Sequence, residues 1–328
     1  MMTDLHTLRT LSARLGADPL LVQAAGGNTS IKKDGVMWIK ASGTWLKDAA
    51  TKDIFVPLNY SQLAGALNAD DPDCESCTSF VRNDLNHTGL RPSIETSVHG
   101  LMPQNVVLHV HCVSTIAWAI HADAERLLTE KLHGESWAYI PYARPGLALS
   151  KAIRARLSPG CNALVLGNHG LVVAGETVDE AGDVLERIVG KLERNPRSVP
   201  LPDLVALAAI AKGTEYVPAI ALETHAAALD QAALAHGLHK VFYPDHVVFL
   251  GTEIPTALSS SAPAIAIPGK GVLIHGSAKA AVEPMMRCLA DVLRRVEPGS
   301  SLNALTVSDI DQLLNWDAEI YRQALKAH

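Results

Sequence analysis

Residues 106–111 read VVLHVH, an unbroken run of branched aliphatic residues and histidines that predicts a buried β-strand. Successive side chains of a strand point to opposite faces, so His109 and His111 share one face while Leu108 and Val110 face the core. Two imidazoles on one face of a stiff strand can reach the same cation, because a metal–nitrogen bond is about 2.0–2.1 Å long. The H-x-H spacing is short and common, so two unrelated solvent-facing histidines are the alternative interpretation.

A third histidine lies in a polar turn, Asn168-His169-Gly170, between apolar segments at residues 163–166 and 171–174. These segments predict short buried strands. The turn between them is expected at the edge of a sheet, where functional sites are commonly built. A histidine that only satisfies local hydrogen bonds is the plainer explanation of this motif when it is taken alone.

Glu95 follows Pro92 and Ser93, which are typical of a helix start, so we expect it in the first turn of a helix over residues 93–102. A carboxylate in that position favours the helix dipole, which is a purely structural role. Beside a divalent cation, the same carboxylate can take a proton from a carbon atom whose acidity the metal has raised. The functional interpretation of Glu95 therefore depends on the histidines.

Two turns, at residues 25–30 and 42–44, are rich in glycine and hydroxyl side chains. Such turns expose backbone N–H groups and can cradle a phosphate. Lys32, Lys33 and Lys40 lie close to them in the sequence and would add positive charge. Either turn taken singly is also explained as an ordinary connection between strands.

Six motifs in one order resemble the class II aldolase/adducin family, and the resemblance covers residues 1 to about 195. They are Gly27-Asn28-Thr29-Ser30, Ser42-Gly43, Pro92-Ser93-Ile94-Glu95, His109-Val110-His111, Pro141-Tyr142-Ala143 and Asn168-His169-Gly170. Each motif is weak alone, whereas six in sequence order over about 150 residues form a specific signature.

The resemblance implies an α/β fold in which a three-layer αβα domain is built around a mixed, partly antiparallel sheet. It also implies a homo-oligomer, a tetramer or a dimer, with the site between subunits. The family's sugar-phosphate aldolases bind zinc through three histidines, which the resemblance matches to His109, His111 and His169. Three imidazoles favour zinc or a similar borderline ion, with cobalt and manganese as the alternatives.

The resemblance also carries catalytic and binding roles onto this chain. The family's catalytic carboxylate matches Glu95, and the tyrosine that protonates the leaving aldehyde oxygen matches Tyr142. The chain departs from the pattern at Ile94, where those aldolases often have a second hydroxyl, and at Arg144, which could meet an anionic substrate. The family's phosphate pocket maps onto Asn28, Ser42, Gly43 and Ser93.

The predicted function is that of a metal-dependent aldolase that cleaves a ketose, in first place a ketose 1-phosphate, by a retro-aldol reaction. Decarboxylases and dehydratases of phosphorylated sugars or sugar acids share the fold and keep a glutamate, so they are alternatives. Epimerases of the family carry Asp at the position of Glu95, which counts against that reaction. A non-catalytic adducin-like module is an alternative of another class, although such modules lack the full set of histidines.

The sequence divides into a catalytic domain at residues 1–195 and an accessory α+β region at residues 203–328, joined by a proline-rich linker at 194–202. The second region resembles the extended branch that includes the aldolase half of rhamnulose-phosphate aldolase/dehydrogenases. No G-x-G-x-x-G dinucleotide motif opens a helix in the chain. We therefore expect the region to pack on the first domain and to add specificity rather than chemistry.

Hydrophobic periodicity predicts the remaining elements. In the first domain, helices are expected at 4–15, 60–67, 115–122, 147–157 and 178–192, strands at 36–39 and 54–58, and an irregular loop at 68–90. In the second, helices are expected at 203–211, 221–235, 278–295 and 307–326, and strands at 241–242, 246–250, 264–267 and 272–274.

Composition limits the partners. A net charge of −6, with no basic block, gives no reason to expect nucleic acid. No run of 18 apolar residues occurs, and the N-terminus has the spacing of an amphipathic helix rather than of a signal peptide, so no membrane association is expected. Five scattered cysteines predict reduced thiols in a cytoplasmic protein. A small sugar or sugar phosphate is the expected partner.

Overall fold

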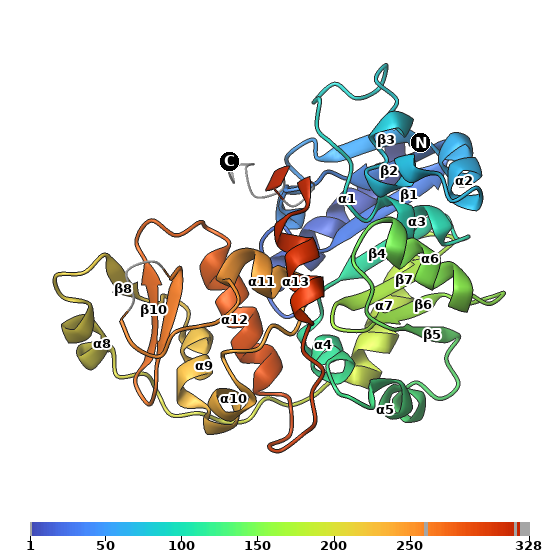
Figure 1. The fold of residues 1–328 in the computed structure, drawn as a ribbon. Helices are drawn as coiled ribbons and strands as arrows, with labels where there is room; N and C mark the ends of the chain where they lie inside the picture. The colour runs from blue at the N-terminus through green and yellow to red at the C-terminus, as the bar shows by residue number, and fades with distance from the viewer. Residues whose placement is uncertain (1, 259–261, 318–319, 322–328) are drawn as a thin grey trace.

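The computed structural model describes residues 2–258, 262–317 and 320–321. The chain forms two parts that lie side by side in Figure 1, one coloured blue to green and one coloured yellow to red. Among the described residues, no helix combines the length and the apolar character that crossing a bilayer requires. The first part contains the larger sheet and carries all the residues that the sequence singled out.

A seven-stranded mixed sheet forms the centre of the first part (Figure 1). Its strand order is β3-β2-β1-β4-β7-β6-β5, and neighbouring strands are antiparallel except for the parallel pair β5 and β6. The mixed, partly antiparallel sheet predicted from the sequence is confirmed. The strands are β1 (Asn28–Lys33), β2 (Val36–Lys40), β3 (Phe55–Asn59), β4 (Val106–Val110), β5 (Trp137–Ile140), β6 (Ala163–Leu166) and β7 (Gly170–Gly175).

Helices cover both faces of this sheet, which gives the expected three layers. Leu8 of α1 (Met2–Ala17) and Leu185 of α7 (Val178–Leu192) pack on one face, in the same cluster as Leu108 of β4. The other face is covered by α2 (Tyr60–Asn68), α3 (Thr96–Leu101) and α6 (Leu147–Arg156). The first part also contains α4 (Val113–Ala119) and α5 (Ala124–Lys131).

The apolar spacing of α7 shows why these helices form. Val178, Ala181, Leu185 and Ile188 recur every three or four residues and are buried, which places one stripe of the helix against the sheet. The side chain of Thr177 accepts a hydrogen bond from the N–H of Glu180 and so caps the first turn. The predicted helix at 178–192 agrees with α7 because the apolar spacing, the capping threonine and the packing on the sheet all favour a helix there.

The second part is a smaller α+β unit with a three-stranded antiparallel sheet of order β8-β10-β9. Helix α12 packs against β9 of this sheet and against α4 of the first part. The elements of the second part are α8 (Leu204–Ala211), β8 (Tyr216–Pro218), α9 (Ala226–Leu229), α10 (Gln231–His236), α11 (Pro244–Leu250), β9 (Ala264–Ile267), β10 (Gly271–His275), α12 (Val282–Leu293) and α13 (Val307–Leu314).

The structure corrects one prediction that matters for the site. Residues 246–250 were predicted as a strand, but they belong to helix α11, and residues 241–242 lie outside any strand. Pro244 presets the backbone angle of the first helical turn. The helix is then buried on nearly every side, so its apolar run has no helical period that would reveal it.

Other boundaries differ from the predictions in smaller ways. Strand β1 begins at Asn28, within the expected turn, and β5, β8 and α5 were not predicted. The expected helix at 221–235 is broken into a 3-10 turn, α9 and α10, and the loop at 68–90 holds two short 3-10 turns. Helix α13 ends at Leu314, and the end of the helix expected at 307–326 lies outside the described residues.

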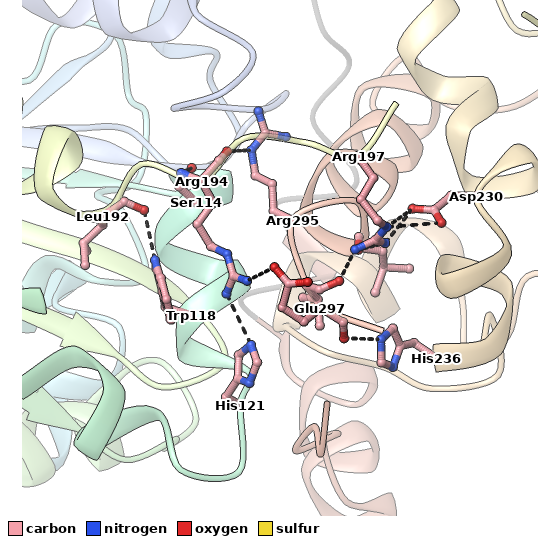
Figure 2. A network of polar contacts seen from close by, with 12 residues as sticks. Ser114, Trp118, His121, Leu192, Arg194, Arg197, Asp230, His236, Arg295 and Glu297 are labelled. Carbon is pink, nitrogen blue, oxygen red and sulfur yellow. Dashed lines mark hydrogen bonds and ion pairs between the residues drawn. The ribbon is translucent and has the colours of Figure 1, made fainter. Parts of the chain in front are cut away.

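The predicted linker is bound tightly to both parts of the chain (Figure 2). The Arg194 guanidinium stacks 4.1 Å from the ring centroid of Trp118, and its backbone carbonyl accepts a hydrogen bond from Arg295. Arg197 pairs with Asp230 of the second part. The segment between the two parts is therefore held by contacts on both sides. The domain boundaries at 195 and 203 stay a prediction.

Truncation after Val199 is expected to give an insoluble fragment. Val113, Ile116 and Ile120 are buried in one cluster with Met285 and Leu289 of α12, so removing the second part exposes an apolar surface on the first. Expression of residues 1–199 beside the full chain, followed by size-exclusion chromatography, checks this. A monodisperse fragment with a cooperative unfolding transition would contradict it.

Candidate metal centre and active site

Three histidines come from one strand and one hairpin turn. His109 lies in β4, and His111 follows the end of that strand, while His169 lies in the turn between β6 and β7. Asn168 adopts a left-handed backbone conformation, with φ of 54°, which turns the chain sharply before His169. A Cβ atom on Gly170 would lie 2.5 Å from the carbonyl oxygen of Val110, so only glycine lets the hairpin approach β4 this closely.

The Nε2 atoms of the three imidazoles converge on Glu95. His109 Nε2 lies 3.3 Å from Glu95 Oε2, and His169 Nε2 lies 3.3 Å from Glu95 Oε1. His111 Nε2 is 3.1 Å from His109 Nε2. One donor atom from each of the four residues lies within 4.8 Å of the others, and all four residues are buried. This is the one such group of metal-ligand side chains among the residues that the structure describes.

The opposite ring nitrogens determine which protons the histidines carry. His109 Nδ1 lies 3.0 Å from the carbonyl oxygen of Leu171, which can only accept a hydrogen bond, so this nitrogen holds the proton. His111 Nδ1 lies 3.0 Å from Asp245 Oδ2, which is ion-pair distance. The Nε2 atoms of His109 and His111 lie 3.1 Å apart, so both can contact a cation placed between them. The donor set therefore fits a divalent metal.

A chain of hydrogen bonds holds Glu95 in place. The Asn28 side-chain amide donates to Glu95 Oε2 at 2.8 Å, and the carbonyl oxygen of the same amide bonds to His99 Nε2. His99 Nδ1 in turn lies 2.7 Å from the Ser30 hydroxyl. Strand β1 brings these residues into position, because Asn28 is paired with His109 in the register of β1 and β4. Glu95 itself is the N-cap of α3 rather than part of its first turn.

Burial sets the charge states of this group. It lowers the pKa of His109 to about 4 and that of His169 to about 3. Burial alone would raise the pKa of Glu95, but the three imidazoles and the Asn28 amide together lower it to about 2. At neutral pH Glu95 is therefore ionised and His109 and His169 are neutral, and these are the forms that bind metal ions.

A cavity opens beside the four residues, and each of the predicted phosphate-binding residues lines it. The Ser42 hydroxyl is buried there without a hydrogen-bond partner among the described residues. The Ser93 hydroxyl accepts a hydrogen bond from the N–H of Glu95, and Lys40 donates to the carbonyls of Ala25 and Gly27. The residues predicted for phosphate are Asn28, Ser42, Gly43 and Ser93.

Two of the three lysines near the turns lie elsewhere. Lys32 Nζ donates to the carbonyls of Met102 and Gln104 inside the first part of the chain, and burial lowers its pKa to about 7. Lys33 pairs with Asp4 at the surface. Lys40 alone of the three lines the cavity, so the expected cluster of positive charge is reduced to one ammonium group.

Tyr142 and Arg144 are not brought into the cavity. The Tyr142 hydroxyl is buried without a hydrogen-bond partner among the described residues, and burial raises its pKa. The ring packs against the cluster around Val241 and Leu313. Arg144 pairs with Glu75 and stacks 4.4 Å from the Trp316 ring centroid, which leaves it engaged away from the metal ligands.

The structure adds two residues that the sequence did not identify. Pro244 and Asp245, at the start of α11, line the cavity and come from the second part of the chain. Asp245 lies more than a hundred residues after His111, and no ligand spacing links the two positions. A proline followed by an acidic residue predicts a helix start, and that is the one signal the sequence offered.

Comparisons with known proteins agree with this architecture. The family described as the class II aldolase and adducin N-terminal domain matches residues 10–192, which is more than half of the chain. The chain belongs to this family. The relatives include YuxG of Bacillus subtilis, described as an uncharacterized oxidoreductase, which is 32% identical over 177 residues. This match covers 50% of the present chain and 25% of YuxG, so the chain spans about a quarter of that relative.

A second relative and a solved structure are also similar to the first part of the chain. L-fuculose phosphate aldolase of Methanococcus vannielii is 27% identical over 179 residues, which cover 52% of this chain and 86% of the aldolase. A solved N-terminal class II aldolase domain from Thermoplasma acidophilum has a TM-score of 0.48 and 25% identity. The matched region is 56% of this chain and 90% of that domain.

The metal-free protein is expected to lose stability as the pH falls below about 6.5. Burial lowers the pKa of His99 and His169 to about 3 and that of His109 and His246 to about 4. These imidazoles titrate near 6.5 in the unfolded chain, which therefore binds more protons below that pH than the folded protein does. Each histidine then lowers the free energy of unfolding by up to about 1.4 kcal/mol per pH unit.

Urea unfolding of the chelator-treated protein at several pH values between about 7.5 and about 5 checks this expectation. In His246→Gln, the slope of the free energy of unfolding against pH should decrease by the contribution of one histidine. A free energy of unfolding that stays constant over this range would show that the folded state binds the same protons as the unfolded chain.

Proposed function

We propose that this chain is a divalent-metal-dependent lyase that cleaves a ketose, and specifically a ketose 1-phosphate, by a retro-aldol reaction. The observation that carries the proposal is the convergence of three imidazole Nε2 atoms on the Glu95 carboxylate. Membership of the class II aldolase family supports it. The sequence similarity to an L-fuculose phosphate aldolase, over 86% of that protein, agrees with the substrate class.

His109, His111 and His169 would hold the metal, with Glu95 within reach of the same point. Imidazole ligands favour zinc, and cobalt or manganese can replace it in such a set. When bound, the ion acts as a Lewis acid that draws electron density from the ketone oxygen of the substrate. The protein's own contribution is a rigid strand and a glycine-dependent hairpin that aim the three rings.

Glu95 would move the proton at the reacting carbon. In cleavage, the hydroxyl on the aldehyde side gives up its proton, the carbon–carbon bond breaks, and its electron pair remains on the ketone-side carbon. The Glu95 carboxylate, which is ionised at neutral pH, would take up the proton that the hydroxyl releases and pass it to that carbon, so that no proton is gained or lost overall. Asn28 fixes the carboxylate by a 2.8 Å hydrogen bond, so the oxygen atoms face the ligands and not the solvent.

The polar lining of the cavity beside the ligands suits an anionic, oxygen-rich group, although its volume of about 20 Å³ in this conformation has room for little more than a water molecule. Ser42 offers a buried hydroxyl with no other partner among the described residues, and the Lys40 ammonium and the Gly43 backbone line the same wall. A buried donor of this kind is stabilised when a ligand oxygen accepts from it. Ile94 lines the cavity where a further hydroxyl was expected, so the phosphate would receive one side-chain donor fewer.

The other reactions of this fold have less support in the site. A decarboxylase needs a cationic partner for the carboxylate of its substrate, and Arg144 is the candidate that the sequence offers. This arginine is paired with Glu75 outside the cavity. Epimerisation rested on an aspartate where this chain has Glu95. A purely structural, adducin-like role does not account for four buried ligand groups, because burying them without a cation costs stability.

The role of Tyr142 as the acid that protonates the aldehyde oxygen remains a proposal. The ring of Tyr142 packs against the cluster that includes Leu313 of α13, and it does not line the cavity, so a catalytic role requires this side chain to change position. Tyr142→Phe removes one hydroxyl and leaves the packing of the ring in place. A loss of turnover in that variant without a change in unfolding would support the role.

The purified protein is expected to carry about one divalent ion per chain, and His109→Ala, His111→Ala and His169→Ala should each lose most of it. Each substitution removes one of the converging nitrogen atoms. Elemental analysis after dialysis measures the metal content. His239→Ala serves as a control, because that side chain is 70% exposed and lies outside the cluster. Full occupancy in any two of the three ligand variants would overturn the metal site.

Glu95→Gln is expected to lower the turnover number by at least about 100-fold, the low end for removing a general acid/base. The amide keeps the shape of the side chain but cannot supply the proton. Aldehyde release from a panel of ketose 1-phosphates, measured with the metal-loaded enzyme, gives the rate. Glu135→Gln is the matched control, because Glu135 pairs with Arg187 and Lys191 away from the cavity. Near-native turnover in Glu95→Gln would assign the proton transfer to another group.

A further inference from the structure

We infer that Asp245 is a positioning residue of the metal centre and that the second part of the chain thereby completes this centre. Asp245 Oδ2 lies 3.0 Å from His111 Nδ1, on the side of the ring opposite the converging Nε2 atoms. Both side chains are buried. The inference rests on the metal site of the proposed function and adds to it a residue that the family match, at 10–192, does not include.

A carboxylate in this position does two things to the imidazole. It fixes the proton on Nδ1, so the Nε2 lone pair is available to the metal, and it holds the plane of the ring. It also makes the ring a stronger ligand than a neutral hydrogen-bond partner would. The comparison lies within the site itself, because His109 Nδ1 donates to the neutral carbonyl of Leu171 instead.

Gly26 provides a second, independent observation. A Cβ atom at this position would lie 2.7 Å from His111 Nδ1, 2.9 Å from the carbonyl oxygen of Gln23 and 3.0 Å from Asp245 Oδ2. The backbone of Gly26 has no positive φ, so its conformation does not require glycine, in contrast to Gly27 with φ of 61°. The missing side chain therefore makes room for the pair formed by His111 and Asp245.

The position of Asp245 is fixed by contacts on both sides of it. Asn168, the neighbour of His169, donates its side-chain amide to the carbonyls of Phe242 and Asn303 at 2.9 Å. Val247 of α11 is buried in one cluster with Leu313 of α13. The turn that carries one metal ligand thus also anchors the segment that carries Asp245, and the two parts of the chain are aligned at the site.

The charge of the site supports the same role. Glu95 and Asp245 bring two carboxylates to the buried group of imidazoles, and two carboxylate charges would balance the charge of a divalent cation. A buried charge is stable when a group of opposite charge compensates it nearby. The second part of the chain was expected to add specificity rather than chemistry, and this contact instead connects it to the metal.

Asp245→Asn tests the inference without removing the shape of the side chain. Its dissociation constant for Co²⁺, followed by absorbance, and that for Zn²⁺, by competition with a chelator, should rise about 10- to 100-fold. Asp291→Asn is the matched control, since Asp291 is a buried carboxylate of the same region that pairs with Arg287 and Arg295. In that variant both constants should stay within about threefold of the wild-type values.

A second measurement separates positioning from general destabilisation. In the Co²⁺-loaded protein, the exchangeable Nδ1 proton of His111 gives a paramagnetically shifted signal, which should move or exchange faster in Asp245→Asn. It should not change in Asp291→Asn. If Asp245→Asn does not fold, Gly26→Ala gives a second test, because its methyl group would crowd His111 Nδ1 and Asp245 Oδ2. Its unfolding is measured alongside, because the same methyl group also meets the carbonyl oxygen of Gln23. The expected result is again weaker metal binding.

The outcomes distinguish the two proposals. A wild-type protein that binds neither metal contradicts the proposed function itself. A wild-type protein that binds metal, together with an Asp245→Asn variant of equal affinity and an unchanged His111 signal, overturns the role of Asp245 and leaves the proposed function standing.

Discussion

Four buried ligand groups, three imidazoles and one carboxylate, face one another where β4, the hairpin of β6 and β7 and the start of α3 meet. The Nε2 atoms of His109 and His111 lie 3.1 Å apart, and the Glu95 carboxylate faces both His109 and His169. Buried polar groups in such an arrangement cost free energy unless a cation satisfies them. The sheet, the hairpin and α11 are therefore built to hold an arrangement that is unfavourable in the absence of the ion.

Each ring is held by a different part of the chain. The central sheet holds His109 through the carbonyl of Leu171, and the second part of the chain holds His111 through Asp245. His169 is held by its hairpin, and its Nδ1 has no hydrogen-bond partner among the described residues. The geometry of the site consequently depends on segments that are far apart in the sequence, and a shift of either part would change how the three imidazoles face one another.

Sequence periodicity predicted most of the sheet and the positions of the histidines, because strand alternation alone places His109 and His111 on one face. Periodicity fails for α11, because a helix that is buried on all sides has no polar face to mark its period. The apolar residues of α11 therefore predict a strand where the structure has a helix. Asp245 was missed for a related reason. Its role follows from a contact across more than a hundred residues, and no local pattern encodes that contact.

Linkage gives the second part of the chain a thermodynamic consequence. If Asp245 strengthens metal binding about 10- to 100-fold when α11 is docked, the bound metal must favour the docked state by the same factor, which is about 1.4–2.8 kcal/mol. The apolar contacts between α4 and α12 already join the two parts, and the ion would add to them. Metal binding and domain docking are then one coupled equilibrium, in which the anchor at Asn168 transmits the position of the second part directly to the turn that carries His169.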